Sequence, residues 1–240
     1  MTMDTSSPTD SSHQVLGKSF FQNPIFIIIG ATLLFICANL FSVVAVEGLG
    51  TLDKTQKLFL LGVGNLVFLL LILNFLKRRI RFSWKSIGFV KPARKYVWYV
   101  IPAVFVYFIA SMMLTSIAMK LLTNFDVNQS QDIGFDQSLQ SLGLIYAFLT
   151  LVIITPIFEE TIFRGVLFKG LRYRLPFWVS VILTSIIFAA AHMQLNVALD
   201  TFALSVILCT LVEKSKSVVP AICLHAIKNG LAFSLLFIIK

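Results

Sequence analysis

The chain alternates between long apolar stretches and short polar or basic ones. The apolar stretches, which are candidate helices, are 25–46, 58–76, 96–122, one that runs from 142 through Glu159 to the cations at 169–174, 177–192, 197–212 and 218–239. A run of about 18 or more apolar residues is typical of a helix that crosses a bilayer. The pattern predicts an all-α, polytopic transmembrane helical bundle with about seven spans, in a range of about six to eight.

Residues 1–23 have a different character from the rest of the chain. They are rich in Ser and Thr and show no hydrophobic periodicity, which predicts a flexible polar tail. The apolar stretch that Pro24 opens is too long for the core of a signal peptide, and no small-residue cleavage pattern follows it. We therefore expect an uncleaved first span and a single integral-membrane domain over 24–240, with the chemical motifs in 155–240.

The composition supports a membrane protein and limits its partners. The chain is 58% hydrophobic and only 13% charged, and its formal net charge is +9. Such a charge could indicate nucleic-acid binding, but most of the basic residues flank the apolar stretches, where they determine orientation. We expect the lipid bilayer as a partner and no nucleic acid.

The basic residues also predict the orientation of the spans. The block 77–95 holds eight Lys or Arg residues and no acid, which places it, and with it the N-terminus, in the cytoplasm. The stretch 124–140 carries Asp126, Asp132 and Asp136 without Lys or Arg and is expected outside. Trp84 among the cations is typical of a segment that lies on lipid headgroups, with a solvated loop as the alternative.

Two adjacent carboxylates interrupt the fourth apolar stretch. An ionisable side chain at the centre of a membrane helix costs about 2.5–3.5 kcal/mol, so such residues usually face a polar interior and mark function. Glu160 and Arg164 are four residues apart and can form an ion pair on one helix face. Glu159 points about 100° away from Glu160 and lacks that partner. The alternative to a functional site is an ion pair that only holds helices together.

Other polar residues in the later spans lie at a similar depth. Measured from the basic end of each helix at about 1.5 Å per residue, Glu159, His192, His225 and Asn229 lie roughly 14–24 Å along their helices. Four groups from three helices can therefore meet in one cavity inside the bilayer. A carboxylate with an imidazole can activate water, and a histidine with an amide can stabilise an oxyanion. Taken singly, a membrane histidine is more often a hydrogen-bonding partner between helices.

Three motifs in this order resemble a known family. They are Glu159-Glu160-x-x-x-Arg164, Phe188-x-x-x-His192 and His225-x-x-x-Asn229, and they cover roughly the C-terminal half of the chain. This half is similar to the CAAX-protease and bacteriocin-processing (CPBP) intramembrane proteases, to which the type II CAAX prenyl endopeptidases belong.

The resemblance implies a glutamate-dependent endopeptidase, a hydrolase that carries out proteolysis within the membrane. On this basis Glu159 is the base, and His192 helps to hold the water. His225 and Asn229 polarise the scissile carbonyl, and Glu160 and Arg164 shape the site or contact the substrate. Phe188 is expected to pack.

The resemblance and the sequence also suggest a class of substrate and a cellular location. The resemblance implies a peptide precursor or a membrane protein as substrate, and nothing in the sequence indicates a prenyl pocket. We expect a multi-pass protein of a prokaryotic plasma membrane with its N-terminus in the cytoplasm. The alternative function is a non-catalytic transporter, or a bacteriocin-immunity or scaffold protein, that uses the same polar cluster as a ligand or proton site; no inverted repeat supports a transporter.

Metal dependence is a separate question. Zinc peptidases commonly carry His-Glu-x-x-His, which this chain lacks, although zinc ligands from three helices remain an alternative. Asn229 beside His225 is a poor zinc ligand and a good donor to an oxyanion. We therefore expect no cofactor and no metal, with zinc as the option not favoured.

Overall fold

The computed structural model describes residues 23–48, 50–80, 83–123, 125–127, 129, 135, 139 and 141–239. These residues are mainly helical and form no strand. The predicted tail at 1–22, together with Asp132 and Asp136 of the acidic stretch, lies outside the described residues. The helices are α2 (Pro24–Glu47), α3 (Lys54–Ile80), α4 (Arg94–Trp98), α5 (Val100–Leu121), α6 (Leu142–Phe148), η1 (Leu149–Ile154), α7 (Thr155–Glu160), η2 (Thr161–Phe168), α8 (Lys169–Arg172), α9 (Phe177–Ala190), α10 (Leu195–Ser215) and α11 (Val219–Phe237).

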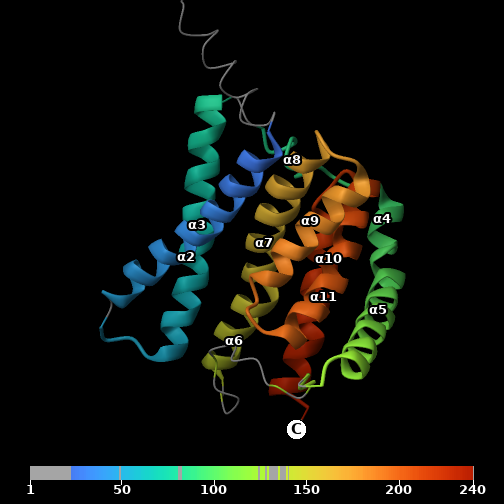
Figure 1. Ribbon diagram of the computed structural model, residues 1–240. Coiled ribbons are helices and arrows are strands. Elements are labelled where there is room, and N and C mark those ends of the chain that lie inside the picture. Colours follow the sequence, from blue (N-terminus) through green and yellow to red (C-terminus); the bar gives the residue numbers. More distant parts are fainter. Residues whose placement is uncertain are drawn as a thin grey trace, which may run out of the picture.

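The helices form the predicted membrane bundle. Among the described residues, six helical stretches are long and apolar enough to cross a membrane. The continuous fourth stretch, Leu142–Arg172, runs from α6 to α8. It lies in the middle of the bundle, with α2 and α3 on one side and α10, α11 and α5 on the other (Figure 1). The prediction of an all-α, multi-pass membrane protein is confirmed.

The fifth predicted stretch is shorter than the sequence suggested. α9 has 14 residues, about 21 Å of helix, whereas the bilayer core is about 30 Å thick. It ends at Ala190 because the N–H groups of His192 and Met193 bond back to the carbonyls of Ala189 and Ala190 in a turn. Met193 has a positive φ of 58° there, which breaks the helical path. His192 therefore lies in the α9–α10 turn and not on the helix.

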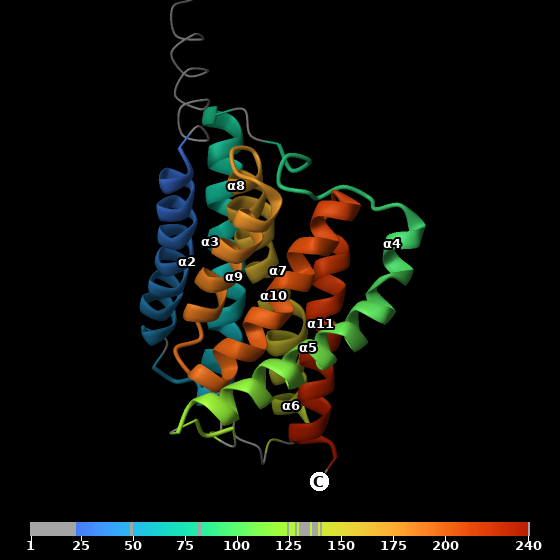
Figure 2. The same cartoon turned by 45° about the vertical axis from the view of Figure 1, so that its right-hand side comes forward.

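The basic connections meet at one end of the bundle, as predicted. Arg172 Nη2 binds Glu213 Oε1 at 2.9 Å, and Ser217 Oγ donates to the carbonyl of Val90 at 2.6 Å. At the opposite end, Asn196 Nδ2 donates to the carbonyl of Gln129 at 2.8 Å. The turned view shows α5 crossing α10 and α11 obliquely (Figure 2). The basic connections therefore share one end of the bundle, and the contact between Asn196 and Gln129 lies at the other end.

Residues 83–90 pack against the bundle on one side, while Ser83, Lys85 and Ser86 are exposed, so the prediction of a segment on headgroups or in solvent stays a prediction. Ile87 is buried and Trp84 packs half-buried against the same apolar cluster. The Val218 N–H donates to the carbonyl of Gly88 at 2.9 Å, and Gly88 has a φ of +93° that glycine adopts without strain. Side chains of this basic region thus contribute to the core of the protein.

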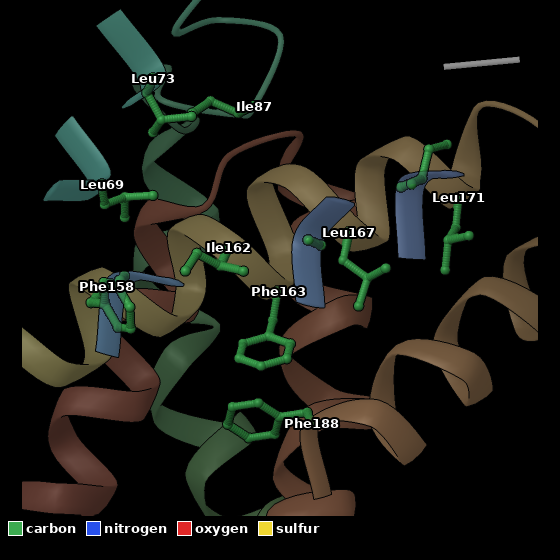
Figure 3. Packing of buried hydrophobic residues seen from close by; sticks show 12 residues of the cluster. Leu69, Leu73, Ile87, Phe158, Ile162, Phe163, Leu167, Leu171 and Phe188 are labelled. Carbon is green, nitrogen blue, oxygen red and sulfur yellow. The ribbon is translucent and has the colours of Figure 1, made fainter. Parts of the chain in front are cut away.

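The core around the fourth stretch holds the catalytic candidates in place. Ile27 of α2, Leu69 and Leu73 of α3 and Ile162 of η2 are at most 1% exposed and belong to one cluster. Figure 3 shows Phe163 facing Phe188 inside it, with their ring centroids 4.9 Å apart. This packing fixes the fourth stretch against α2, α3 and α9.

Candidate active site

The two adjacent glutamates have different surroundings. Glu160 is completely buried and accepts a hydrogen bond of 2.8 Å from Arg164 Nη1, which is also completely buried. The predicted ion pair between residues four apart is therefore present. The Glu159 side chain is 14% exposed. The environment thus leaves Glu159 as the carboxylate that a reactant can reach.

His225 connects the two carboxylates. Its Nδ1 lies 2.8 Å from Glu160 Oε1, the same oxygen that Arg164 binds, and its Nε2 lies 3.9 Å from Glu159 Oε2. Because an ionised carboxylate can only accept, Nδ1–H is the donor to Glu160. The second distance exceeds that of a hydrogen bond. Nε2 is therefore the ring atom of His225 that faces Glu159 and any reactant beside it.

His192 reaches the site through Phe188. The His192 Nδ1 lies 2.9 Å from the carbonyl of Phe188, and since a carbonyl cannot donate, Nδ1 carries the proton. In a neutral ring Nε2 is then an acceptor. The Phe188 ring makes edge contacts with both histidines, at centroid distances of 5.1 Å to His192 and 6.1 Å to His225. Arg164 stacks over the same ring, with Cζ 4.3 Å from its centroid.

Asn229 makes a contact that the sequence did not suggest. Its Nδ2 donates to the carbonyl of Leu151 at 2.9 Å. Leu151 lies in the π-helical segment η1, where the N–H of Thr155 bonds to the carbonyl five residues earlier, that of Thr150. The next residue, Pro156, has no N–H to reach Leu151 in the same way. Asn229 therefore replaces a backbone donor that the proline removes.

The glutamates and histidines of this site are also side chains of the types that bind metals. In the part of the chain that the structure describes, no three His, Cys, Asp or Glu side chains are grouped so that they could hold a metal ion. Glu160 has its Oε1 committed to Arg164 and His225, and His192 directs Nδ1 at a backbone carbonyl. The side chains of the described residues therefore do not form a preassembled zinc site.

A second polar cluster, not recognised in the sequence, lies beside the first. Tyr107 Oη and Ser111 Oγ on α5 each donate to Asp200 Oδ1 on α10 at 2.6 Å. Lys228 Nζ on α11 lies 3.3 Å from Asp200 Oδ2. A signal was available, because Asp200 and Lys228 are ionisable residues inside predicted spans, the feature that identified Glu159.

Comparison with known proteins finds a match over part of the chain. Residues 141–231 match the family model of the Rce1-like type II CAAX prenyl endopeptidases. This part of the chain is therefore similar to that family. No curated protein and no solved structure matches the chain.

The Rce1-like segment contains all six predicted site residues. It starts one residue before α6 and ends two residues after Asn229. The predicted resemblance is confirmed, and the family implies a protease embedded in the membrane, with a protein or peptide substrate.

Proposed function

We propose that the protein is an intramembrane endopeptidase in which Glu159 activates the hydrolytic water. The observation that carries this proposal is the division between the two glutamates. Glu160 is buried and bonded to Arg164 and His225, whereas Glu159 is partly exposed and lies 3.9 Å from His225 Nε2. A carboxylate without a structural partner beside an imidazole is suited to general-base catalysis.

The reaction would proceed through a tetrahedral intermediate. Glu159 takes a proton from water as the water oxygen bonds to the scissile carbonyl carbon. His192 can accept a hydrogen bond from that water through Nε2, because its Nδ1 proton is directed at Phe188. The oxyanion is stabilised by Asn229 and by His225 in its imidazolium form, which donates through Nε2 while its Nδ1–H stays bonded to Glu160. The proton on Glu159 then passes to the nitrogen of the leaving peptide as the C–N bond breaks.

Glu160 and Arg164 would orient His225 without touching the reacting atoms. Glu160 fixes the Nδ1–H form of the imidazole, so that Nε2 is always presented to the reactant. Arg164 holds Glu160 in place through the ion pair, and its stacking on Phe188 joins the pair to α9. The substrates we propose are peptide precursors or membrane proteins, cleaved in a prokaryotic plasma membrane with the protein's N-terminus in the cytoplasm.

The proposal predicts that Glu159→Gln, His192→Ala and His225→Ala each abolish peptide cleavage. The test is cleavage by purified protein of a panel of lipidated and unlipidated peptides, with thermal unfolding in the same detergent to show that each variant folds. Glu213→Gln serves as a matched control because Glu213 pairs with Arg172 at the basic end of the bundle. Near-normal turnover by Glu159→Gln would contradict the proposed mechanism. A wild-type protein that binds the peptides and cleaves none of them would instead support a non-catalytic role.

A further inference from the structure

The cluster of Asp200, Tyr107, Ser111 and Lys228 is not used by the proposed mechanism. It joins three helices, α5, α10 and α11, and it contains an ion pair with 25% of the Asp200 and 22% of the Lys228 side chain exposed. Charged groups within a bilayer almost always face a bundle interior or a water-filled cavity, because exposure to lipid is costly. A pair that is partly exposed at this depth therefore borders a polar space.

Lys228 lies on the side of α11 that carries the site. At about 100° per residue, Lys228 is about 60° from His225 in one direction, and Asn229 is about 40° from it in the other. All three therefore lie within a sector of about 100°. Lys228 is about 4.5 Å further along the helix axis than His225. Lys228 thus lies on the same face of α11 as the two residues proposed to polarise the scissile carbonyl.

The surroundings of Lys228 stabilise its positive charge and leave N–H donors of the ammonium available for another partner. Asp200 Oδ1 accepts two short hydroxyl bonds, from Tyr107 and Ser111, and its other oxygen lies 3.3 Å from Lys228 Nζ. An ammonium has three N–H donors, and this contact directs one of them. The hydroxyl bonds on Oδ1 share the charge of Asp200. Lys228 can therefore bind a second anion without leaving Asp200.

We propose that Lys228 is a substrate-binding residue that receives a carboxylate of the peptide close to the scissile bond. This inference rests on the proposed endopeptidase function and specifies its substrate. A peptide spans about 3.3–3.6 Å per residue when extended, so a carboxylate one to three residues from the cleaved bond lies about 3–11 Å away. Such a carboxylate is either the C-terminus of the peptide, on the leaving side, or an acidic side chain.

Matched peptides distinguish a C-terminal carboxylate from the carboxylate of an acidic side chain. One fluorogenic peptide is made as the free C-terminal acid, as the C-terminal amide, and as the amide with one Glu placed one, two or three residues after the cleaved bond. We expect the wild-type KM to be about tenfold or more lower for a carboxylate-bearing peptide than for the plain amide, as for one charge-assisted hydrogen bond. Preference for the free acid assigns the C-terminus, and preference for a Glu peptide assigns the side chain.

The variants remove the charges in a way that the fold can tolerate. Lys228→Met alone leaves Asp200 unpaired in the membrane, so the deciding variant is Lys228→Met with Asp200→Asn. It should raise KM for the carboxylate peptide relative to the amide until the two KM values are equal. Lys228→Arg should retain the preference. Lys120→Met, which removes an exposed lysine from α5, should behave as wild type.

Two outcomes would overturn the inference while the proposed function stands. The first is a wild-type enzyme that cleaves acid and amide with the same KM. The second is a double variant that keeps the preference or loses activity equally on both peptides, which would indicate a structural pair. Binding of the same peptides to Glu159→Gln protein, with and without the Lys228 and Asp200 changes, decides the question even if no peptide is cleaved.

Discussion

At the scale of single residues, neighbouring side chains of the same type acquire different roles from their surroundings. Glu159 and Glu160 are adjacent and chemically identical. Only Glu160 is enclosed by the Arg164 guanidinium and the His225 ring, with both contacts on one oxygen. When the surroundings of two carboxylates differ in this way, one of them is commonly the reactive group and the other supports it.

Asn229 has a structural contact as well as a proposed catalytic role, and the two can be separated. Asn229→Ala removes an oxyanion donor, which we expect to lower kcat by about 10²- to 10³-fold. It also leaves the carbonyl of Leu151 without its side-chain donor, at a cost of about 1–3 kcal/mol. In the double variant with Pro156→Ala, residue 156 regains an N–H that can bind Leu151. Stability should then recover and activity should not.

The measurements are thermal unfolding in detergent and single-turnover cleavage. Pro156→Ala alone serves as the control and should remain active, because the Leu151 carbonyl has two lone pairs and can accept both donors. If the double variant regains activity together with stability, Asn229 acts only through Leu151.

Metal dependence is the second prediction at this scale. Glu159 and His192 should support cleavage without a bound metal, since Glu160, the remaining glutamate of the motif, is bonded to Arg164 and His225. Protein that is extensively chelated and shown by elemental analysis to contain no metal should keep its cleavage rate. Loss of activity that one equivalent of zinc restores would establish a metalloprotease instead.

The residue contacts were only partly predictable. Spacing of four residues was enough to pair Glu160 with Arg164, because both lie on one helix. The bonds of Glu160 to His225 and of Asn229 to Leu151 join helices that are distant in sequence, and a single sequence contains no measure of how helices are rotated against each other.

At the scale of elements, close approach of two backbones explains a glycine in the fourth stretch. A Cβ on Gly165 would lie 3.0 Å from the carbonyl oxygen of Ile87, in the segment 83–90 that packs into the bundle. Alanine is favoured over glycine within a helix by about 0.5–1 kcal/mol, but forcing the backbone apart costs typically about 1–3 kcal/mol. We expect Gly165→Ala to lower the thermal unfolding temperature. Gly230→Ala, whose Cβ would make an ordinary 3.5 Å contact with Val152, should raise it or leave it unchanged.

Periodicity predicted the elements better than their irregularities. The first span was expected at 25–46 and is Pro24–Glu47, because an apolar run bounded by polar residues defines both of its ends. Pro156 lies at the start of α7, where the π-helical segment η1 gives way to α-helix at Thr155. The second π-helical segment, Thr161–Phe168, contains no proline from which it could have been predicted. The burial of Ile87 was also missed, because the eight basic residues around it dominate the local pattern.

At the scale of the whole molecule, charge along the sequence predicted which connections share an end of the bundle. It did not predict helix neighbours. α5 packs on α10 and α11, and Asp200 on α10 receives bonds from both of the other helices (Figure 2). That arrangement depends on long-range packing, and so the cluster around Lys228 could be found only in three dimensions.

The orientation in the membrane is the last prediction. The basic end, where Arg172 meets Glu213, should face the cytoplasm, because cytoplasmic loops carry an excess of Lys and Arg. The test places one cysteine at Ser83, exposed at the basic end, or at Thr51, exposed in the α2–α3 connection at the other end. Cys37, Cys209 and Cys223 are replaced by alanine in both proteins, since two of them are exposed. An impermeant thiol reagent should label Thr51→Cys in intact cells and Ser83→Cys only after the membrane is opened. Labelling of Ser83→Cys in intact cells would instead place the basic end of the bundle outside the cell.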